Sequence, residues 1–270
     1  MLNKMKYLLI SPMLMIFSLH CSTQESSQQK VENGFDPSKS DAQAIQVVDE
    51  MWQALGGKDN WQKTRYLSFR WILEREGKVV ADYRHDWERY TNGYRVEGTN
   101  REGHHFVVLF DTQAKQGTAY VDGNIMPADS TKFWIDLAYR RFINDSYWLI
   151  MPYKLNDPGV ILNYEGEREI DGSNYDVVKV TFENVGLTPK DTYWAFIDKS
   201  TRLMHKWEYV LQDQQPPPTV AWWKEWQTIG GIKLALNREF ENRPVRIYFK
   251  DVVVSPTVDE EIFELISKTF

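Results

Sequence analysis

Hydrophobic residues recur at every second position along two long parts of the chain. In the first part, Leu67, Phe69, Trp71 and Leu73 are separated by single residues. A period of two is typical of β-strands, whose successive side chains point to opposite faces of a sheet. Short turn signals such as Gly230-Gly231 separate the runs, so we predict 11 or 12 antiparallel strands. The runs are 67–74, 79–90, 94–97, 104–111, 116–121, 160–169, 175–183, 191–198, 203–211, 220–228, 232–241 and 245–254.

A helical period replaces the alternation at 41–56, before the first strand. Ser40 or Asp41 can cap this helix, and Gly56-Gly57 is typical of a helix end. Its apolar stripe predicts that the helix packs on the sheet.

A second helical stretch, 130–152, lies between the two groups of strands. Ser130 or Thr131 can cap it, Asn144-Asp145 is expected to interrupt it, and Pro152 limits it. The apolar segment 147–160 starts in the second half of this helical stretch. We interpret this segment as a lid laid against the open face of the sheet.

These elements predict an α+β protein. Its core is a highly curved antiparallel sheet, an open half-barrel of about 11–12 strands, with the helices at 41–56 and 130–152 covering the concave face. A last short helix is expected after Asp259, with Ile266 on its apolar side. No internal boundary follows the first helix, so 41–270 is predicted to be a single domain.

The first 40 residues have a different character. Two lysines precede an apolar run at 7–19, which is too short to span a bilayer comfortably, and Cys21 follows it closely. This arrangement resembles a bacterial lipoprotein signal, so 1–21 is predicted to be a signal peptide with Cys21 as the lipidated residue. A plain export signal with an incidental cysteine is the alternative. The polar stretch 22–40 is predicted to be a flexible tether.

Charge and motif content exclude several functions. The net charge of −6 argues against a nucleic-acid partner, because phosphate binding depends on lysine and arginine. The single cysteine cannot form an intrachain disulfide. No glycine-rich phosphate loop or nucleophile elbow occurs in the sequence, so we predict no cofactor.

Two segments carry a resemblance to a known family. The hairpin at 195–203 (AFIDKSTRL) joins two strands through a turn led by aspartate, and 247–263 combines a last strand with a closing helix. With the leading helix, they resemble the LolA/LolB-like superfamily of lipoprotein carriers and receptors. The stretches 147–160 and 185–189 are similar to a bacterial lipoprotein branch of that superfamily. The resemblance covers 41–270 and implies an incomplete barrel, closed by helices around an apolar cavity, without catalytic residues.

The predicted cavity would be lined by large apolar side chains. One face of each strand in a half-barrel points inward, and each buried methylene group contributes about 0.8 kcal/mol to the binding of a lipid chain. The alternative is that the same side chains fill one another's space as a closed core. The predicted ligand-binding residues are Phe69, Trp71, Phe110, Trp194, Phe196 and Trp207 from the strands, and Phe142, Trp148, Leu149 and Met151 from the insertion.

Three tryptophans follow the proline run 216–218. We expect Trp222 and Trp226 to share one face of a strand and Trp223 to occupy the other. An exposed aromatic platform suits stacking on a sugar, and ordinary cross-strand packing is the alternative interpretation.

The polar candidates do not form a convincing reactive site. His104 and His105 point to opposite faces of a strand, whereas zinc needs three or four convergent ligands, so we predict no metal. Paired carboxylates, Asp82 with Asp86 or Glu239 with Glu241, suit acid–base cleavage of a glycoside. Acidic residues that alternate with apolar ones are, however, the usual solvent face of a sheet, so we predict no catalytic residues.

The sequence therefore predicts a non-catalytic lipoprotein of the bacterial cell envelope, anchored to the outer membrane and facing the periplasm. Its expected partners are a lipid or acyl chain, including the acyl chains of another lipoprotein, and the membrane reached through the N-terminal lipid. A carbohydrate-binding or glycan-processing protein is one alternative. A structural lipoprotein with a filled core is the other.

Overall fold

The alternating runs form one antiparallel sheet. The computed structural model describes residues 34–183 and 190–264, and all of them fall in one compact unit. The described strands number 13, one more than the upper prediction. Their bounds are β1 (Tyr66–Arg75), β2 (Lys78–Glu88), β3 (Gly93–Thr99), β4 (His105–Asp111), β5 (Gly117–Val121), β6 (Asn124–Ile125), β7 (Val160–Ile170), β8 (Ser173–Phe182), β9 (Thr192–Asp198), β10 (Met204–Val210), β11 (Thr219–Ile229), β12 (Ile232–Phe240) and β13 (Val245–Ser255).

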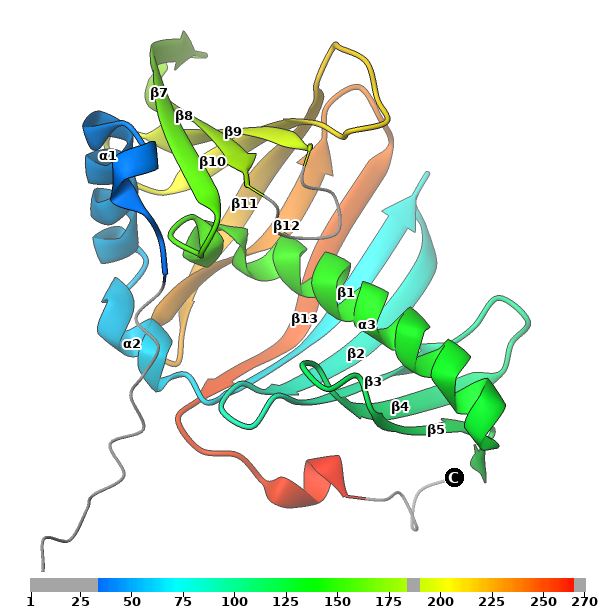
Figure 1. Cartoon of the computed structure of the whole chain (residues 1–270). Coiled ribbons are helices and arrows are strands. Elements are labelled where there is room, and N and C mark those ends of the chain that lie inside the picture. The colour runs from blue at the N-terminus through cyan, green and yellow to red at the C-terminus, as the bar shows by residue number, and fades with distance from the viewer. Residues whose placement is uncertain (1–33, 184–189, 265–270) are drawn as a thin grey trace, which may run out of the picture. The chain divides into compact units, whose positions relative to one another are not determined.

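The strand order joins the first and last strands in the middle of the sheet. It runs β6-β5-β4-β3-β2-β1-β13-β12-β11-β10-β9-β8-β7, so the pair β1 and β13 connects two meanders (Figure 1). In this pair Trp71 lies opposite Phe249. The two edges of the sheet are therefore β6 and β7, which are consecutive in the sequence.

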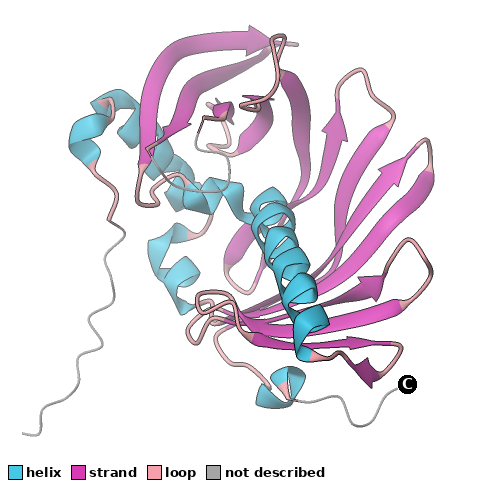
Figure 2. Cartoon of the chain, turned by 45° about the vertical axis from the view of Figure 1, so that its right-hand side comes forward, coloured by secondary structure: helices cyan, strands magenta, loops and turns pink. Residues whose placement is uncertain are grey.

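The sheet is strongly bent, with its two wings facing each other (Figure 2). Register shifts mark the central strands, between Ser68 and Arg70 in the pairing with β13 and between Leu73 and Glu74 in the pairing with β2. Such bulges increase the local twist of a strand and bend it. The sheet remains unclosed, as predicted for an open half-barrel.

The leading helix forms as predicted, with a second helix after it. Helix α1 (Ala42–Ala54) has Asp41 at its N-cap position, contacts β7 and β8, and buries Val48, Met51 and Trp52 in the main core. The predicted helix end at Gly56-Gly57 is instead a bend, and helix α2 (Gly57–Lys63) starts there. Helix α2 has no buried residue and therefore lacks the apolar period that identifies a helix in a sequence.

Helix α3 (Ala128–Ile150) connects the two edges of the sheet. It follows β6, continues into the 3-10 helix η2 (Met151–Lys154) and leads to β7. Its 23 residues correspond to about 34 Å of helix. Helix α3 contacts β4, β5 and β12, and in Figures 1 and 2 it crosses the concave side of the sheet.

The predicted interruption of this helix at Asn144-Asp145 is wrong, because α3 is continuous through both residues. Asp145 is buried and faces His85 on β2, so its side chain is used in a tertiary contact and does not cap a new helix. The predicted caps Ser130 and Thr131 are also incorrect, since the residue at the N-cap position is Pro127.

The described residues include a short element before residue 41. The 3-10 helix η1 (Pro37–Lys39) precedes Ser40, whose hydroxyl accepts a hydrogen bond from the Leu162 backbone N at 2.9 Å. The last part of the predicted tether is thus joined to β7. At the other end, Asp259 caps the 3-10 helix η3 (Glu260–Phe263), as expected. The predicted signal peptide 1–21 with Cys21, the predicted tether up to residue 33, the stretch 185–189 and Ile266 lie outside the described residues.

Candidate functional site

The concave side of the sheet carries the main apolar cluster, and α3 contributes to it along its length. Rings on α3 lie against rings on the strands at both ends and in the middle of the helix. Such pairs join Trp134 to Phe106 (5.4 Å between ring centroids), Phe142 to Tyr94 (4.8 Å) and Trp148 to Trp207 (5.0 Å). Aromatic pairs at such distances add stabilisation beyond the burial of their area. Helix α3 is therefore packed against the sheet by large, flat side chains.

Eight of the ten predicted ligand-binding residues belong to this cluster. Six are buried within it, and Phe142 and Trp148 are partly buried against it. Strands and insertion thus bring these eight side chains together, although ligand binding by them stays a prediction. The six buried residues are Phe69, Trp71, Phe110, Leu149, Met151 and Trp207.

The predicted inward orientation of Trp194 and Phe196 is wrong. Both pack with Tyr175 and Val177 in a separate cluster on the convex face. Their neighbours Ala195 and Ile197 point into the main core instead. Both sets of β9 side chains are apolar, so the alternation alone does not determine which set faces inward.

Polar side chains also occupy inward positions, and the sequence reasoning missed them. His85 lies on β2 between the inward residues Tyr83 and Trp87, and it is fully buried. Its Nδ1 is 2.8 Å from the Tyr94 hydroxyl, and its Nε2 is 3.3 Å from Asp145 Oδ2 on α3. Burial raises the pKa of Tyr94 well above 10.0, so its hydroxyl keeps its proton and can donate to Nδ1.

Arg238 is the second buried polar residue on the concave side. It lies on β12 at 0% exposure, and its guanidinium carbon is 3.6 Å from the Trp223 ring centroid. Nε donates to the Trp148 carbonyl of α3 at 3.0 Å, and Nη1 donates to the Ala235 carbonyl at 2.7 Å. Burial lowers the pKa of Arg238, because desolvation disfavours the charged form. No described carboxylate forms an ion pair with it.

Both polar residues interrupt an apolar alternation at an inward position. Arg238 falls between Leu236 and Phe240 just as His85 falls between Tyr83 and Trp87. A polar residue at such a position is the signal that identifies them in the sequence.

The predicted arrangement of the three tryptophans is wrong in one respect. Trp226 stacks on the inward Trp223, with ring centroids 6.4 Å apart, and it packs against the main cluster. Glu225 between them has φ 59°, which turns the strand so that Trp226 does not share the face of Trp222. Trp222 lies near the ammonium group of Lys206 instead. The pair Trp222 and Trp226 therefore forms no common platform for a sugar.

The candidate carboxylates are engaged in ordinary contacts. Asp86 accepts hydrogen bonds from Tyr66 at 2.5 Å and from Ser68 at 2.7 Å, and burial together with Asp86 raises the pKa of Tyr66 to about 12. Glu239 forms an ion pair with Lys224, whose hydrogen bond lowers the pKa of Glu239. A general acid needs a raised pKa, so the lowered pKa of Glu239 does not suit that role.

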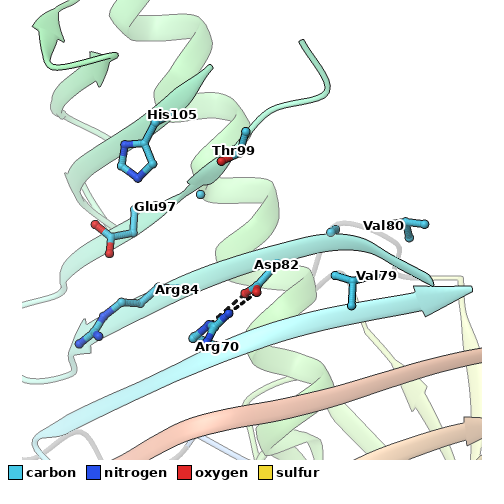
Figure 3. Close-up of a pocket in the computed structure, with 10 residues that line it drawn as sticks. Arg70, Val79, Val80, Asp82, Arg84, Glu97, Thr99 and His105 are labelled. Atoms are coloured by element: carbon cyan, nitrogen blue, oxygen red, sulfur yellow. Dashed lines mark hydrogen bonds and ion pairs between the residues drawn. The ribbon is translucent and has the colours of Figure 1, made fainter. Parts of the chain in front are cut away.

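A groove of about 430 Å³ lies on the convex face, between β1, β2 and β3 (Figure 3). Its polar lining includes Arg70 and Asp82, which pair with each other, and Arg84, which pairs with Asp86. Val79 and Val80 at its end are exposed. The groove is open and ionic in character, unlike the apolar concave side.

The described residues form neither a metal-binding cluster nor a membrane-spanning helix. The described chain contains no group of three or more His, Cys, Asp and Glu side chains that could hold a metal ion. His104 pairs with Asp122 at 2.6 Å instead of meeting other ligands. None of the described helices is both long and apolar enough to cross a membrane.

Comparison with known proteins supports the fold. A family of unknown function, DUF6503, matches residues 124–230, from β6 to the turn after β11. None of the curated proteins matches the sequence. A DUF1329 family protein from Desulfovibrio piger is similar in structure, with 14% identity, coverage of 82% of this chain and 97% of that chain, and a TM-score of 0.50.

A LolA superfamily protein from Nitrosomonas europaea is also similar, with 10% identity, coverage of 82% and 98% of the two chains, and a TM-score of 0.47. At these identities the likeness concerns the fold alone. The chain thus shares the fold of the DUF1329 family protein.

Proposed function

We propose that this protein is a non-catalytic carrier or receptor for an apolar ligand, a lipid or the acyl chains of another lipoprotein, in the bacterial cell envelope. The observation that carries the proposal is the aromatic concave side of the sheet beneath α3. A surface of this kind gains free energy from any alkyl chain laid on it, at about 25 cal/mol per Å² of buried apolar area.

Helix α3 would act as the lid in this proposal. Its aromatic contacts occupy the concave side in the described structure, so a ligand enters only if α3 moves away from the strands. The helix connects the sheet edges and belongs to no strand ladder. Its displacement therefore leaves the hydrogen bonds of the sheet intact and costs the packing of one face together with the contacts of Arg238 to the Trp148 carbonyl and of His85 to Asp145.

The attachment to the membrane belongs to the same proposal. Lipidation of Cys21 would hold the domain at the membrane through an N-terminal lipid, facing the periplasm. Metabolic labelling with an alkyne fatty acid tests this point: wild-type protein should be labelled and fractionate with membranes, whereas Cys21→Ser protein should be unlabelled. Equal labelling of both would contradict lipidation at Cys21.

The binding experiment uses co-purification and uptake. Native mass spectrometry after gentle purification should reveal a bound lipid, and delipidated protein should take up a fluorescent neutral apolar probe. Trp207→Ala, on the concave side, should change the affinity for the probe. Trp222→Ala, which removes the same side chain from the convex face, should not.

The carrier proposal fails if no lipid co-purifies and the probe does not bind. The concave side is then a filled core and the protein is a structural lipoprotein. The sugar-binding alternative lacks a supporting observation, because Trp226 is turned toward Trp223.

A further inference from the structure

Arg238 carries a charge into the apolar interior, and none of the described residues is its counterion. Its guanidinium carbon lies over the Trp223 ring, 3.6 Å from the centroid, and 5.1 Å from the Phe249 ring centroid. A guanidinium stays protonated in proteins, and an ion removed from water without a partner costs several kcal/mol even after relaxation. Stacking on tryptophan offsets part of this cost. A hydrophobic residue of similar volume would fill the same space more cheaply, so a core-filling role does not explain the arginine.

The two edges of the guanidinium have different surroundings. Nη1 is fixed to the backbone of its own strand, by bonds to the Ala235 carbonyl at 2.7 Å and the Asn237 carbonyl at 3.3 Å. On the other edge, Nε donates to the Trp148 carbonyl of α3, and Nη2 is buried with no hydrogen-bond partner among residues 34–183 and 190–264. Nε and Nη2 together are the parallel donors by which arginine binds an oxyanion in a bidentate manner.

Movement of α3 would complete this fork. Trp148 and its carbonyl belong to the helix, so when α3 leaves the strands, Nε loses its only acceptor while Nη1 stays fixed to β12. The open form then presents two aligned, unpaired donors at the base of an aromatic surface.

We infer that Arg238 binds the oxyanion headgroup of an acidic amphiphile whose alkyl chain lies along the concave side beneath α3. The inference rests on the proposed function and specifies its ligand: a long-chain molecule with a carboxylate or phosphate at one end. In the closed form the Trp148 carbonyl takes the place of one headgroup oxygen. In the open form the headgroup supplies the missing counterion.

The test measures displacement of the neutral probe N-phenylnaphthylamine from delipidated protein by three ligands of equal chain length. They are dodecanoic acid, its uncharged methyl ester and dodecyl phosphate. Because a hydrogen bond to a charged group contributes about 1.5–3 kcal/mol, the acid should compete about tenfold or more better than the ester. The phosphate arm distinguishes a fatty acid from a phospholipid headgroup as the preferred source of the oxyanion.

Variants assign the preference to Arg238. Arg238→Met should abolish the difference between acid and ester while leaving the affinity for the ester nearly unchanged. The matched control is Arg246→Met, because Arg246 is paired with Glu74 outside the main cluster and should not affect the preference. Arg238→Lys keeps the charge but lacks the fork, so it should retain only part of the preference.

The outcomes separate this inference from the proposed function. If the probe binds but acid and ester compete equally with wild-type protein, the inference is overturned and the carrier proposal stands. A preference that survives in Arg238→Met overturns it as well. If the probe does not bind at all, the carrier proposal fails and this inference fails with it. The wild-type comparison decides the question even if Arg238→Met does not fold.

Discussion

His85 Nε2 on β2 lies 3.3 Å from Asp145 Oδ2 on α3, and both side chains are buried in a mainly apolar interior. The Tyr94 hydroxyl meets the other imidazole nitrogen, and Phe69 stacks on the ring at 4.8 Å. This contact is a polar connection between the sheet and the middle of α3. Its geometry restricts where along the strands the helix can lie.

Removing one partner should leave the facing atom of the other buried without its close polar neighbour. We expect His85→Phe and Asp145→Leu each to lower the free energy of unfolding by about 2–3 kcal/mol. The double variant should lose clearly less than the sum, since it leaves neither group alone. Urea unfolding of the four proteins measures this coupling. His104→Phe, which disrupts the exposed pair with Asp122, serves as the control and should have little effect; strict additivity of the buried pair would contradict the coupling.

Gly56 and Gly57 should respond very differently to alanine. Gly56 has φ 111°, and an added Cβ would lie 2.4 Å from the Gly231 carbonyl oxygen. Gly57 has φ 83°, and the nearest atom to an added Cβ is 3.9 Å away. Gly57→Ala should therefore cost about 1–2 kcal/mol from backbone strain alone, and Gly56→Ala more than about 3 kcal/mol. Thermal unfolding compares the two, and similar melting temperatures would show that the bend between α1 and α2 tolerates the clash.

Trp222 and Trp226 should differ in their contribution to stability. Trp226 packs against Trp223 and the main cluster, so Trp226→Ala should lower the free energy of unfolding by about 2–3 kcal/mol. Trp222 is on the other face, near Lys206, and its replacement by alanine should cost about 1 kcal/mol or less. Denaturant titration of both variants is the measurement. A larger loss for Trp222→Ala would reverse the assignment of the two faces.

Asp198 should make the β9–β10 hairpin sensitive to acid. Burial alone would raise the pKa of Asp198, but hydrogen bonds from Ser200 and Thr201 outweigh it and hold this pKa below its ordinary 3.8. A lowered pKa in the folded state stabilises the fold above the pKa of the unfolded chain, and the contribution disappears as the pH falls through the folded-state value. Asp198→Asn should therefore lose about 1–2 kcal/mol at pH 7, and the difference from wild type should shrink below about pH 4. A difference that is constant from pH 7 to pH 3 would exclude the carboxylate as its source.

The alternation predicted the sheet well because each strand has one face in the core and one outside. All 12 predicted runs correspond to strands, whereas β6, with only two residues, is too short to show a period. The glycine pair after α1 was interpreted as a helix end, but α2 follows at once and presents no apolar stripe.

The sequence predicts which kinds of side chain form the candidate site, but only partly which face of the sheet each of them occupies. On β9 bulky residues such as Trp194 occupy one face and Ala195 and Ile197 the other, so tertiary pairing with β8 and β10 decides which set faces inward. The rule that large aromatic residues face the core fails there, because a second, smaller cluster on the convex face accommodates them. The contact between His85 and Asp145 depends on where α3 crosses β2, which no local pattern encodes.

The pairing of β1 with β13 has a consequence for how the chain acquires its structure. Tyr66 and Ser255 are partners across this junction although nearly the whole domain separates them in the sequence. As the chain emerges from its N-terminal end, β1 lacks its β13 partner until the last strand of the domain arrives. Contacts of such long range make folding slow, and the exposed edge of β1 in the meantime is a place where a chaperone would need to bind.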